Sequence, residues 1–197
     1  MKPLKKPGKK KKQLVDAFIR SMERFCSHHF WAACLYTKIF EKMTIDEFSI
    51  VDLPADTTLL DIGCGSLPHS FITLAKTWGW HTHGIDIDTQ AVNNAKTIVK
   101  RFGLEDHISV EVANGLTYDP SSYDFIVLSH GVEPKDQILE KLSKEMKPTA
   151  LLLYRTITKK LTKVYGDEPI PDAFTVLKEY NRVDGIRTMV LTLNQKQ

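Results

Sequence analysis

The first quarter of the chain places apolar residues at steps of three and four positions. The series lies between Gln13 and Met43 and comprises Val15, Phe18, Ile19, Met22, Phe25, Cys26, His29, Phe30, Ala33, Tyr36, Thr37 and Phe40. This spacing is the period of one helix face, so it predicts an amphipathic helical segment with room for one break. The many aromatic rings suit either packing on a sheet or covering a ligand pocket.

The rest of the chain alternates short apolar runs with amphipathic stretches. We expect strands at 58–62, 82–87, 108–113, 123–129 and 150–156, two further apolar runs at 174–180 and 188–193, and helices at 68–78, 90–102 and 135–146. Alternating strand and helix units of this length predict an α/β fold, a mostly parallel sheet with helices on both faces. The expected organisation is a basic tail at 1–12, an N-terminal helical segment at 13–56 and a ligand-binding domain at 57–197.

Composition narrows the class of protein. A chain of 197 residues with 42% hydrophobic residues fits one packed domain. We expect a cytoplasmic protein without a membrane partner, because no apolar run approaches the roughly 18 residues of a membrane span and no apolar signal segment follows the first lysines. The three cysteines lack CxxC spacing, which favours reduced thiols.

Lysine is concentrated at the N-terminus. Seven of the 27 basic residues lie in Met1–Lys12, which leaves 20 basic residues against 24 acidic ones in the remainder. Two interpretations stay open. The segment is a solvated, disordered tail, since Pro3, Pro7 and Gly8 oppose a regular helix, or it grips the phosphate backbone of RNA.

The candidate chemistry begins where the first expected strand ends. Asp61-Ile62-Gly63-Cys64-Gly65 places two glycines at alternate positions, which lets the backbone turn sharply and approach a ligand. Ser66 is a candidate cap for the next helix, and Pro68 suits its first turn. The second strand ends about twenty residues later in Gly84-Ile85-Asp86-Ile87-Asp88. We expect Asp86 to accept the ribose hydroxyls of a nucleotide-like ligand, with Asp88 as the alternative.

The loop lacks the GxGxxG spacing of dinucleotide sites and the chain has no GxxxxGK[ST], which favours S-adenosyl-L-methionine. The Asp-x-Gly-x-Gly motif resembles that of class I S-adenosylmethionine-dependent methyltransferases. The resemblance implies a Rossmann-like seven-stranded sheet whose last strand is antiparallel beside the fifth. It also implies that Asp61 holds the amino group of the cofactor. Asn114-Gly115 falls where those enzymes recognise adenine, or forms only a turn. The expected cofactor contacts are Asp61, Gly63, Gly65, Ser66, Leu67, Pro68, Asp86, Ile87, Asn114, Gly115 and Ser129.

A narrower resemblance lies in the stretch Gly63-Cys64-Gly65-Ser66-Leu67-Pro68-His69-Ser70. It is similar to the GxGPLPLT loop of nicotianamine synthases, and Glu133-Pro134-Lys135, Leu153-Tyr154-Arg155-Thr156 and Tyr165 are similar to archaeal members. That family transfers the 3-amino-3-carboxypropyl group of the cofactor to an amine. It has a larger N-terminal helical domain with a catalytic acid, for which Glu23 or Glu41 is the candidate here.

Catalytic candidates lie at the carboxyl ends of the strands, where open α/β sheets bind ligands. We select His130 as a possible base and Arg155 as a possible clamp for a substrate carboxylate, together with Glu133 and Tyr154. A turn histidine and a surface-paired arginine are the structural alternatives. His69 opens the first helix of the sheet domain.

No metal site is expected, because Cys26, His28, His29 and Cys34 fit a packed helix face better than a ligand set. The leading hypothesis is an S-adenosylmethionine-dependent methyltransferase with a small nitrogen-containing acceptor. The alternatives are aminocarboxypropyl transfer, RNA methylation guided by Met1–Lys12, and a non-catalytic cofactor-binding module. The sequence leaves the oligomeric state open.

Overall fold

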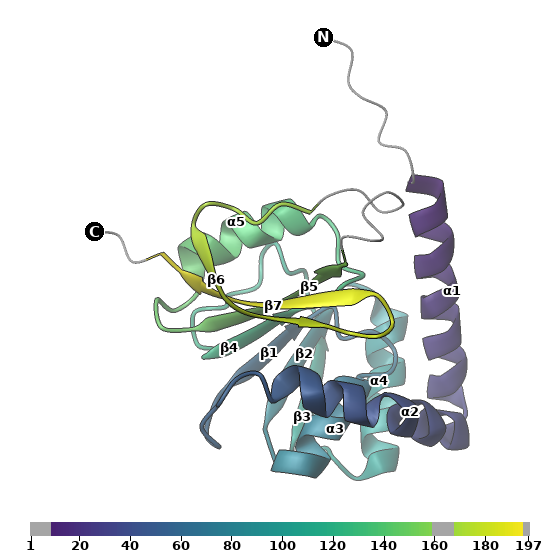
Figure 1. Cartoon of the computed structure of the whole chain (residues 1–197). Coiled ribbons are helices and arrows are strands. Elements are labelled where there is room, and N and C mark those ends of the chain that lie inside the picture. The colour runs from purple at the N-terminus through teal and green to yellow at the C-terminus, as the bar shows by residue number, and fades with distance from the viewer. Residues whose placement is uncertain (1–8, 159–167, 195–197) are drawn as a thin grey trace.

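The computed structural model describes residues 9–158 and 168–194, without the side chains of residues 9–16. Its centre is a seven-stranded sheet with the strand order β3-β2-β1-β4-β5-β7-β6 (Figure 1). The strands are β1 (Leu59–Ile62), β2 (Thr82–Asp86), β3 (Ile108–Val112), β4 (Phe125–Leu128), β5 (Leu151–Ile157), β6 (Phe174–Asn181) and β7 (Ile186–Leu193). The first five are parallel, and β7 is antiparallel to both β5 and β6. The Rossmann-like sheet and its antiparallel last strand are therefore confirmed.

Helices cover both faces of the sheet. They are α1 (Lys9–His28), α2 (Phe30–Phe48), α3 (His69–Trp78), α4 (Thr89–Phe102) and α5 (Lys135–Glu145). One core cluster joins α2, α3 and α4 to alternate strand residues such as Leu59 and Phe125. The other joins α5 to the intervening residues, such as Leu60 and Ile126. β1 and β4 are buried along their whole length because both faces are covered.

The N-terminal helical segment is broken once, at His29, whose extended backbone precedes α2. α1 begins at Lys9, so the helix takes in the backbone of residues that we expected in the tail. Met1–Gly8 lie outside the described residues. Cys26 is buried as expected, whereas His29 is exposed rather than part of the packed face. Among the described residues, no helix has the length and apolar content needed to cross a bilayer.

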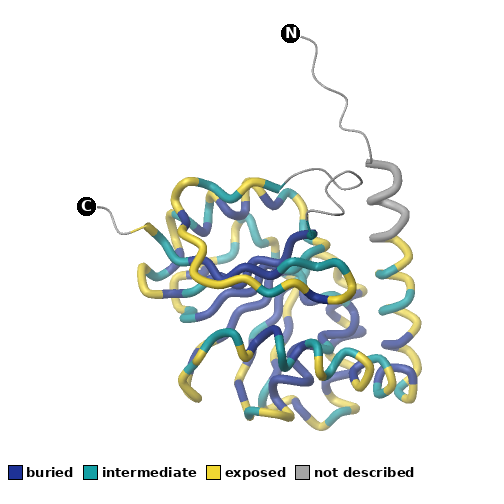
Figure 2. Tube along the Cα trace, viewed as in Figure 1, coloured by how far each residue is buried: buried dark blue, intermediate teal, exposed yellow. Residues whose placement is uncertain are grey.

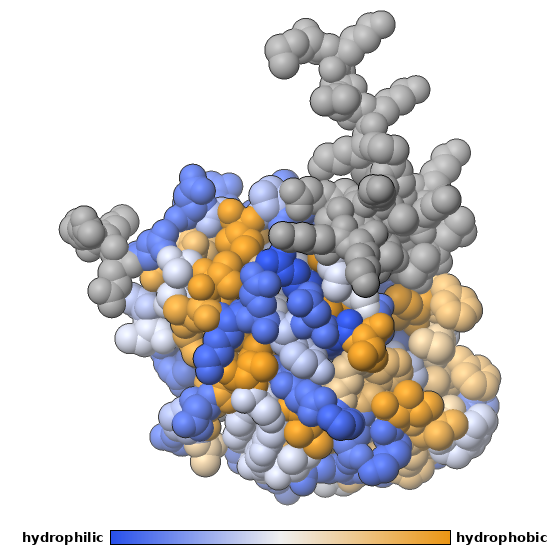
Figure 3. All heavy atoms as spheres, in the orientation of Figure 1, coloured by the Kyte–Doolittle hydropathy of each residue, from blue (hydrophilic) through white to orange (hydrophobic). Residues whose placement is uncertain are grey.

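The two helices of the N-terminal segment pack against different parts of the molecule. α2 packs across α3, whereas α1 stands at the side of the molecule and contacts α2 and α4 (Figure 1). Burial follows this arrangement, because the buried positions concentrate in the sheet and the helix faces that meet it (Figure 2). α1 has one face, with Glu23, toward Gly65 after the end of β1, and another face, with Phe18 and Phe25, exposed to solvent. Hydrophobic side chains gather at the lower right of the molecule, where α1 and α2 meet (Figure 3).

Candidate cofactor and acceptor site

The glycine loop after β1 is held in a conformation that favours glycine. The main-chain N–H groups of Gly63 and Cys64 donate to the carbonyl oxygen of Ile85, at 2.8 and 3.1 Å, which fastens the loop to β2. Gly63 and Gly65 have φ angles of 89° and 68°. A Cβ on Gly63 would lie 2.2 Å from Cγ2 of Val132. The backbone therefore passes through a space that excludes a side chain, as the sequence predicts.

Asp86 organises this loop from the end of β2. Its Oδ2 accepts a hydrogen bond from the Gly65 N–H at 2.9 Å, and its Oδ1 accepts one from the Asp88 N–H at 2.9 Å. Asp88 instead caps α4, accepting from the N–H groups of Gln90 and Ala91. Asp86 therefore contacts the glycine loop directly, whereas Asp88 serves as the cap of α4.

Asp61 is buried at the end of β1, and the Ser129 hydroxyl donates to its Oδ1 at 3.0 Å. Burial raises the pKa of Asp61 to about 6, although the charge of Arg155 and the Ser129 hydrogen bond act in the opposite direction. A cationic ligand group beside this carboxylate would lower its pKa again. The structure therefore brings together two of the expected cofactor contacts, Asp61 and Ser129.

Asn114 and Gly115, the expected adenine contacts, follow the end of β3. Asn114 makes a turn, in which its Oδ1 accepts from the Leu116 N–H at 2.9 Å. The amide nitrogen of Asn114 remains the donor available for recognising a base. Ile87 and Val112, at the ends of β2 and β3, are exposed apolar side chains, and Ile87 is 71% exposed. Apolar side chains beside a polar turn suit a planar, partly apolar ring.

Three other expected cofactor contacts lie at the start of α3. Ser66, Leu67 and Pro68 are buried, so their side chains shape the loop from within. The expected cap at Ser66 is not formed. Pro68 occupies the N-cap position, and no side chain caps the helix. Gly115 is fixed by packing, because a Cβ there would lie 2.7 Å from Cγ2 of Ile62.

α1 brings a carboxylate to the glycine loop. Glu23 Oε2 lies 3.1 Å from the position that a Cβ on Gly65 would occupy. Burial raises the pKa of Glu23 to about 7, and the negative charges of Asp86 and Asp61 act in the same direction against that of Arg20. The sequence named Glu23 only as one of two acids without a motif. Its position depends on the packing of α1, which residue spacing does not encode.

An aromatic cluster lies between α2 and α3. The ring centroids of Tyr36 and Phe40 are 4.6 Å apart, and each ring lies within 5.5 Å of the His69 ring. Burial lowers the pKa of His69 to about 3, so the imidazole is neutral at physiological pH. Burial raises the pKa of Tyr36, and the charge of Glu23 adds to this shift. Tyr36 thereby links the aromatic cluster to the acid on α1.

Of the four expected catalytic residues, Arg155 lies apart from the others, whereas the charges of Glu133 and His130 act on Tyr154 and on its partner Glu168 respectively. Tyr154 is fully buried on the α5 side of the sheet, where its hydroxyl donates to Glu168 Oε2 at 3.3 Å. Lys135 and Thr156 donate to the same oxygen at 2.9 and 2.7 Å. His130 and Glu133 lie in the loop between β4 and α5, half-buried and exposed respectively. Tyr154, which we expected as a catalytic residue, is thus buried, with its hydroxyl in a hydrogen-bonded cluster around Glu168.

Arg155 is also buried, and its guanidinium group is paired with the carboxylate of Glu47. Its Nε and Nη2 donate to Glu47 at 2.9 and 2.8 Å, and Nη2 also donates to Ser70. Arg182 Nη1 donates to the same carboxylate at 3.1 Å, as does the Thr188 hydroxyl at 2.5 Å. Although burial opposes ionisation, the two arginines keep the pKa of Glu47 below its usual range. The sequence reasoning did not select Glu47 or Arg182, which are 135 positions apart in the chain.

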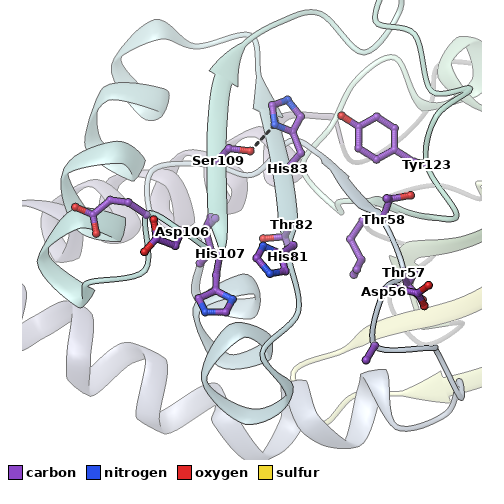
Figure 4. A pocket seen from close by; sticks show the side chains of 14 residues that line it. Asp56, Thr57, Thr58, His81, Thr82, His83, Asp106, His107, Ser109 and Tyr123 are labelled. Atoms are coloured by element: carbon purple, nitrogen blue, oxygen red, sulfur yellow. Dashed lines mark hydrogen bonds between the residues drawn. The ribbon is translucent and has the colours of Figure 1, made fainter.

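A separate cavity of about 390 Å³ lies at the opposite end of the parallel strands (Figure 4). Its lining includes the start of β1, His81 to His83, and 105–109 at the start of β3. The rings of His81 and His107 are 4.8 Å apart. Ligands of open α/β sheets bind at the carboxyl ends of the strands, so this cavity is not the cofactor site.

Comparison with known proteins gives the family. The methyltransferase domain model matches residues 31–186. The chain belongs to this methyltransferase family. The match includes the glycine loop, Asp86 and Asn114, and S-adenosylmethionine is the cofactor of this methyltransferase domain. The buried acid, the glycine cradle and the exposed Ile87 fit such a group.

Individual relatives differ in their reactions. The chain is 32% identical over 112 residues to phosphoethanolamine N-methyltransferase of Plasmodium falciparum, covering 53% of this chain and 41% of the relative. It is 30% identical over 112 residues to L-histidine 2-aminobutanoyltransferase of Pseudomonas aeruginosa, covering 55% and 42%. The chain spans about two fifths of the length of these two relatives. The crystal structure of MtNAS in complex with MTA and tNA has the same fold, with a TM-score of 0.77 at 13% identity over 89% of this chain and 71% of that one.

Proposed function

We propose that this methyltransferase domain transfers the methyl group of S-adenosylmethionine to a small nitrogen-containing acceptor. The observation that carries the proposal is Glu23, which α1 places against Gly65 of the cofactor loop. Its pKa of about 7 suits a group that takes up a proton near neutral pH. A protonated amine has to lose a proton before its nitrogen lone pair can attack, so a carboxylate at this point serves that acceptor class.

The cofactor supplies a methyl group on a sulfonium. Attack by the nitrogen would form the C–N bond as the C–S bond breaks with its electron pair left on sulfur, and Glu23 would take the N–H proton. In this scheme Asp61 holds the cofactor amino group, Asp86 the ribose and Asn114 the adenine. His130 stays a second candidate base in the β4–α5 loop. Alignment of the two reactants supplies several kcal/mol of the rate enhancement.

The aromatic cluster on the same side supports a small acceptor. Tyr36, Phe40 and His69 lie between α2 and α3, and Tyr36 is electrostatically coupled to Glu23. Aromatic faces stabilise organic cations in the way that cation–π contacts do. The rings and the carboxylate together form a surface for a protonated amine before it reacts.

The test is product identification by mass spectrometry after incubation of the protein with S-adenosylmethionine and a panel of amines, amino acids and ethanolamine derivatives. We expect S-adenosylhomocysteine and a methylated amine. Glu23→Gln should lower kcat by about 100-fold or more and remove the dependence of kcat on ionisation near pH 7, whereas Glu41→Gln serves as the matched control. Cofactor binding without turnover of any acceptor would contradict the proposal.

Aminocarboxypropyl transfer is the second candidate, favoured by the Leu67-Pro68 loop and by the aminobutanoyltransferase relative. The same acid and rings would serve it, because its acceptor is also an amine. The nucleoside product separates the two reactions. Methylthioadenosine in place of S-adenosylhomocysteine would overturn methyl transfer and support this candidate.

A further inference from the structure

Three polar side chains on one face of β2 and β3 are joined by two hydrogen bonds. His83 lies on β2, and Ser109 and Glu111 lie on the edge strand β3. Nδ1 of His83 is 2.7 Å from the Ser109 hydroxyl oxygen, and Nε2 is 3.0 Å from Oε1 of Glu111. The parallel register sets these contacts, because His83 lies opposite Ser109, and alternate residues of β3 share a face. We call these three residues the Ser109–His83–Glu111 triad.

The two hydrogen bonds select one tautomer of the neutral His83 imidazole. A carboxylate can only accept, so Nε2 carries the proton and donates it to Glu111. Nδ1 is then the acceptor, and the Ser109 hydroxyl donates to it. A hydroxyl that is bonded to a base, which a third group orients, is the arrangement of an activated nucleophile. Ser109 is exposed, so this hydroxyl is open to a substrate.

Two tyrosines hold the base and the acid of the triad in place. The Tyr118 hydroxyl donates to the Glu111 carboxylate and lies 3.0 Å from the Tyr123 hydroxyl. Burial and these hydrogen bonds raise the pKa of Tyr118, so its hydroxyl stays protonated and remains a donor. Both tyrosine rings lie within about 20° of parallel to the His83 ring, with centroids 5.8 and 6.2 Å away. These contacts fix the imidazole where it meets Ser109.

The edge of the sheet supplies a main-chain donor beside Ser109. Ala113, just after β3, donates its N–H to the carbonyl oxygen of Asp86 at the end of β2. The N–H groups of a strand alternate in direction, so Val110, three residues earlier, directs its N–H away from β2. No described strand lies beyond β3 on that side. In acyl-transfer sites, the N–H of the residue after the nucleophile stabilises the oxyanion.

The cavity at the amino ends of the strands gives a substrate access to the triad. Ser109 and His83 line it together with Tyr123, and their hydrogen bond is visible in the close-up view (Figure 4). Its volume of about 390 Å³ suits a small molecule. The described lining contains no Lys or Arg, and it contains the acids Asp56, Glu105 and Asp106. This negative charge repels an anionic substrate and favours a neutral or cationic one.

We propose that the Ser109–His83–Glu111 triad is a second catalytic site, which hydrolyses small neutral or cationic carboxylic esters. Ser109 Oγ bonds to the ester carbonyl carbon, and its proton goes to Nδ1 of His83. The C–O bond to the alcohol breaks with its electron pair on oxygen, which takes the proton from His83. Water then attacks the acyl-serine with His83 as the base, which releases the acid and restores Ser109. Glu111 is a positioning residue. The reaction consumes only the ester and water, so it is independent of methyl transfer.

The test is labelling of the full chain with a fluorophosphonate probe, with the modified residue identified by mass spectrometry, and hydrolysis of p-nitrophenyl acetate in parallel. We expect the probe on Ser109 and turnover of the ester. Ser109→Ala should abolish both, and His83→Gln should lower the labelling rate by about 100-fold or more. Ser121→Ala is the matched control, at an exposed serine in the loop before β4, and should change neither.

Glu111→Gln tests the positioning role. It should lower kcat for the ester about 10-fold or more and leave KM nearly unchanged, because it misaligns the base without removing a substrate contact. A purely structural role for Glu111 would leave kcat of the folded variant unchanged. Far-UV circular dichroism of each variant establishes folding.

Three outcomes would overturn the proposal. One is labelling of Ser109 that is no faster than labelling of Ser121. Another is labelling of Ser109 at the wild-type rate in folded His83→Gln, which shows that the histidine does not activate the hydroxyl. The third is ester hydrolysis that continues at the wild-type rate in folded Ser109→Ala, which assigns it to attack by another side chain.

Discussion

Arg155 on β5 and Glu47 on α2 form a bidentate ion pair inside the protein, with N–O distances of 2.9 and 2.8 Å. Arg182, beyond the end of β6, completes the contact from a third part of the chain. The helical segment is thereby fastened to the antiparallel edge of the sheet. Because α2 also carries Tyr36 and Phe40, this buried pair holds in place the helix that supplies the aromatic side chains of the proposed acceptor site.

Removing the charge of Glu47 should destabilise the protein. Glu47→Gln leaves two buried guanidinium groups facing a neutral amide, and breaking a buried pair costs about 3–5 kcal/mol. Urea unfolding followed by circular dichroism measures the loss. Glu41→Gln, which breaks the exposed pair with Lys38, should cost less than about 1 kcal/mol. Equal losses of unfolding free energy in the two variants would show that burial does not determine how much an ion pair contributes to stability.

Ionisation of Glu23 should contribute to the pH dependence of the free energy of unfolding. The folded protein keeps this carboxyl protonated up to about pH 7, whereas the unfolded chain releases the proton near pH 4.5. The folded state therefore binds more protons in that window, so this contribution is complete below pH 4.5 and is lost as pH rises to about 7.

Glu23→Gln should remove that loss, which we expect to be about 2 kcal/mol after allowance for solvent screening. The measurement is the free energy of unfolding of wild type and variant at several values between pH 4 and 8. The free energy of unfolding of the variant should increase relative to that of wild type as pH rises. Glu140→Gln, an exposed change on α5, should leave the profile parallel to wild type.

Alanine at two glycines should separate loop geometry from stability. Gly65 and Gly103 have φ angles of 68° and 66°, so both replacements strain the backbone by about 1–2 kcal/mol. Only Gly65 belongs to the cofactor loop, and its new Cβ would lie 3.1 Å from Glu23. By calorimetry, Gly65→Ala should weaken S-adenosylmethionine binding at least about 10-fold, an energy of about 1.4 kcal/mol. A similar weakening by Gly103→Ala would trace the effect to general destabilisation.

Asp86→Asn should weaken cofactor binding about 10- to 100-fold. The amide has one acceptor oxygen in place of two, so it cannot hold both the Gly65 and Asp88 N–H groups and also accept from a ribose. Asp88→Asn makes the same change two positions later, where asparagine still caps α4. If both variants bound the cofactor equally well, the assignment of the ribose contact to Asp86 would be wrong.

Much of the sheet domain could be predicted because its signals are local. The apolar runs placed all seven strands to within about two residues, and the glycines marked the loop because only a residue without a side chain fits at φ of 89° beside Val132. Asp86 could be found because its distance from the loop is set by one strand–helix–strand unit.

The surroundings of the expected catalytic residues could not be predicted from local sequence signals. Strand position placed Tyr154 and Arg155 toward the carboxyl end of β5, but it did not show that both are buried and held by Glu168 and Glu47. Those partners come from distant parts of the chain, and no spacing rule connects them. A buried arginine and a substrate-binding arginine look alike in a sequence.

The sequence by itself determined the α/β fold, the glycine loop and the acids at the ends of its strands, because hydrophobic period and turn chemistry act over a few residues. Only the tertiary structure decided that Glu23 reaches Gly65, that Glu47 neutralises Arg155, and that α1 and α2 leave one apolar face outside. Those outcomes depend on how α1 and α2 pack, and packing is set by the shape and burial of residues far apart in the chain.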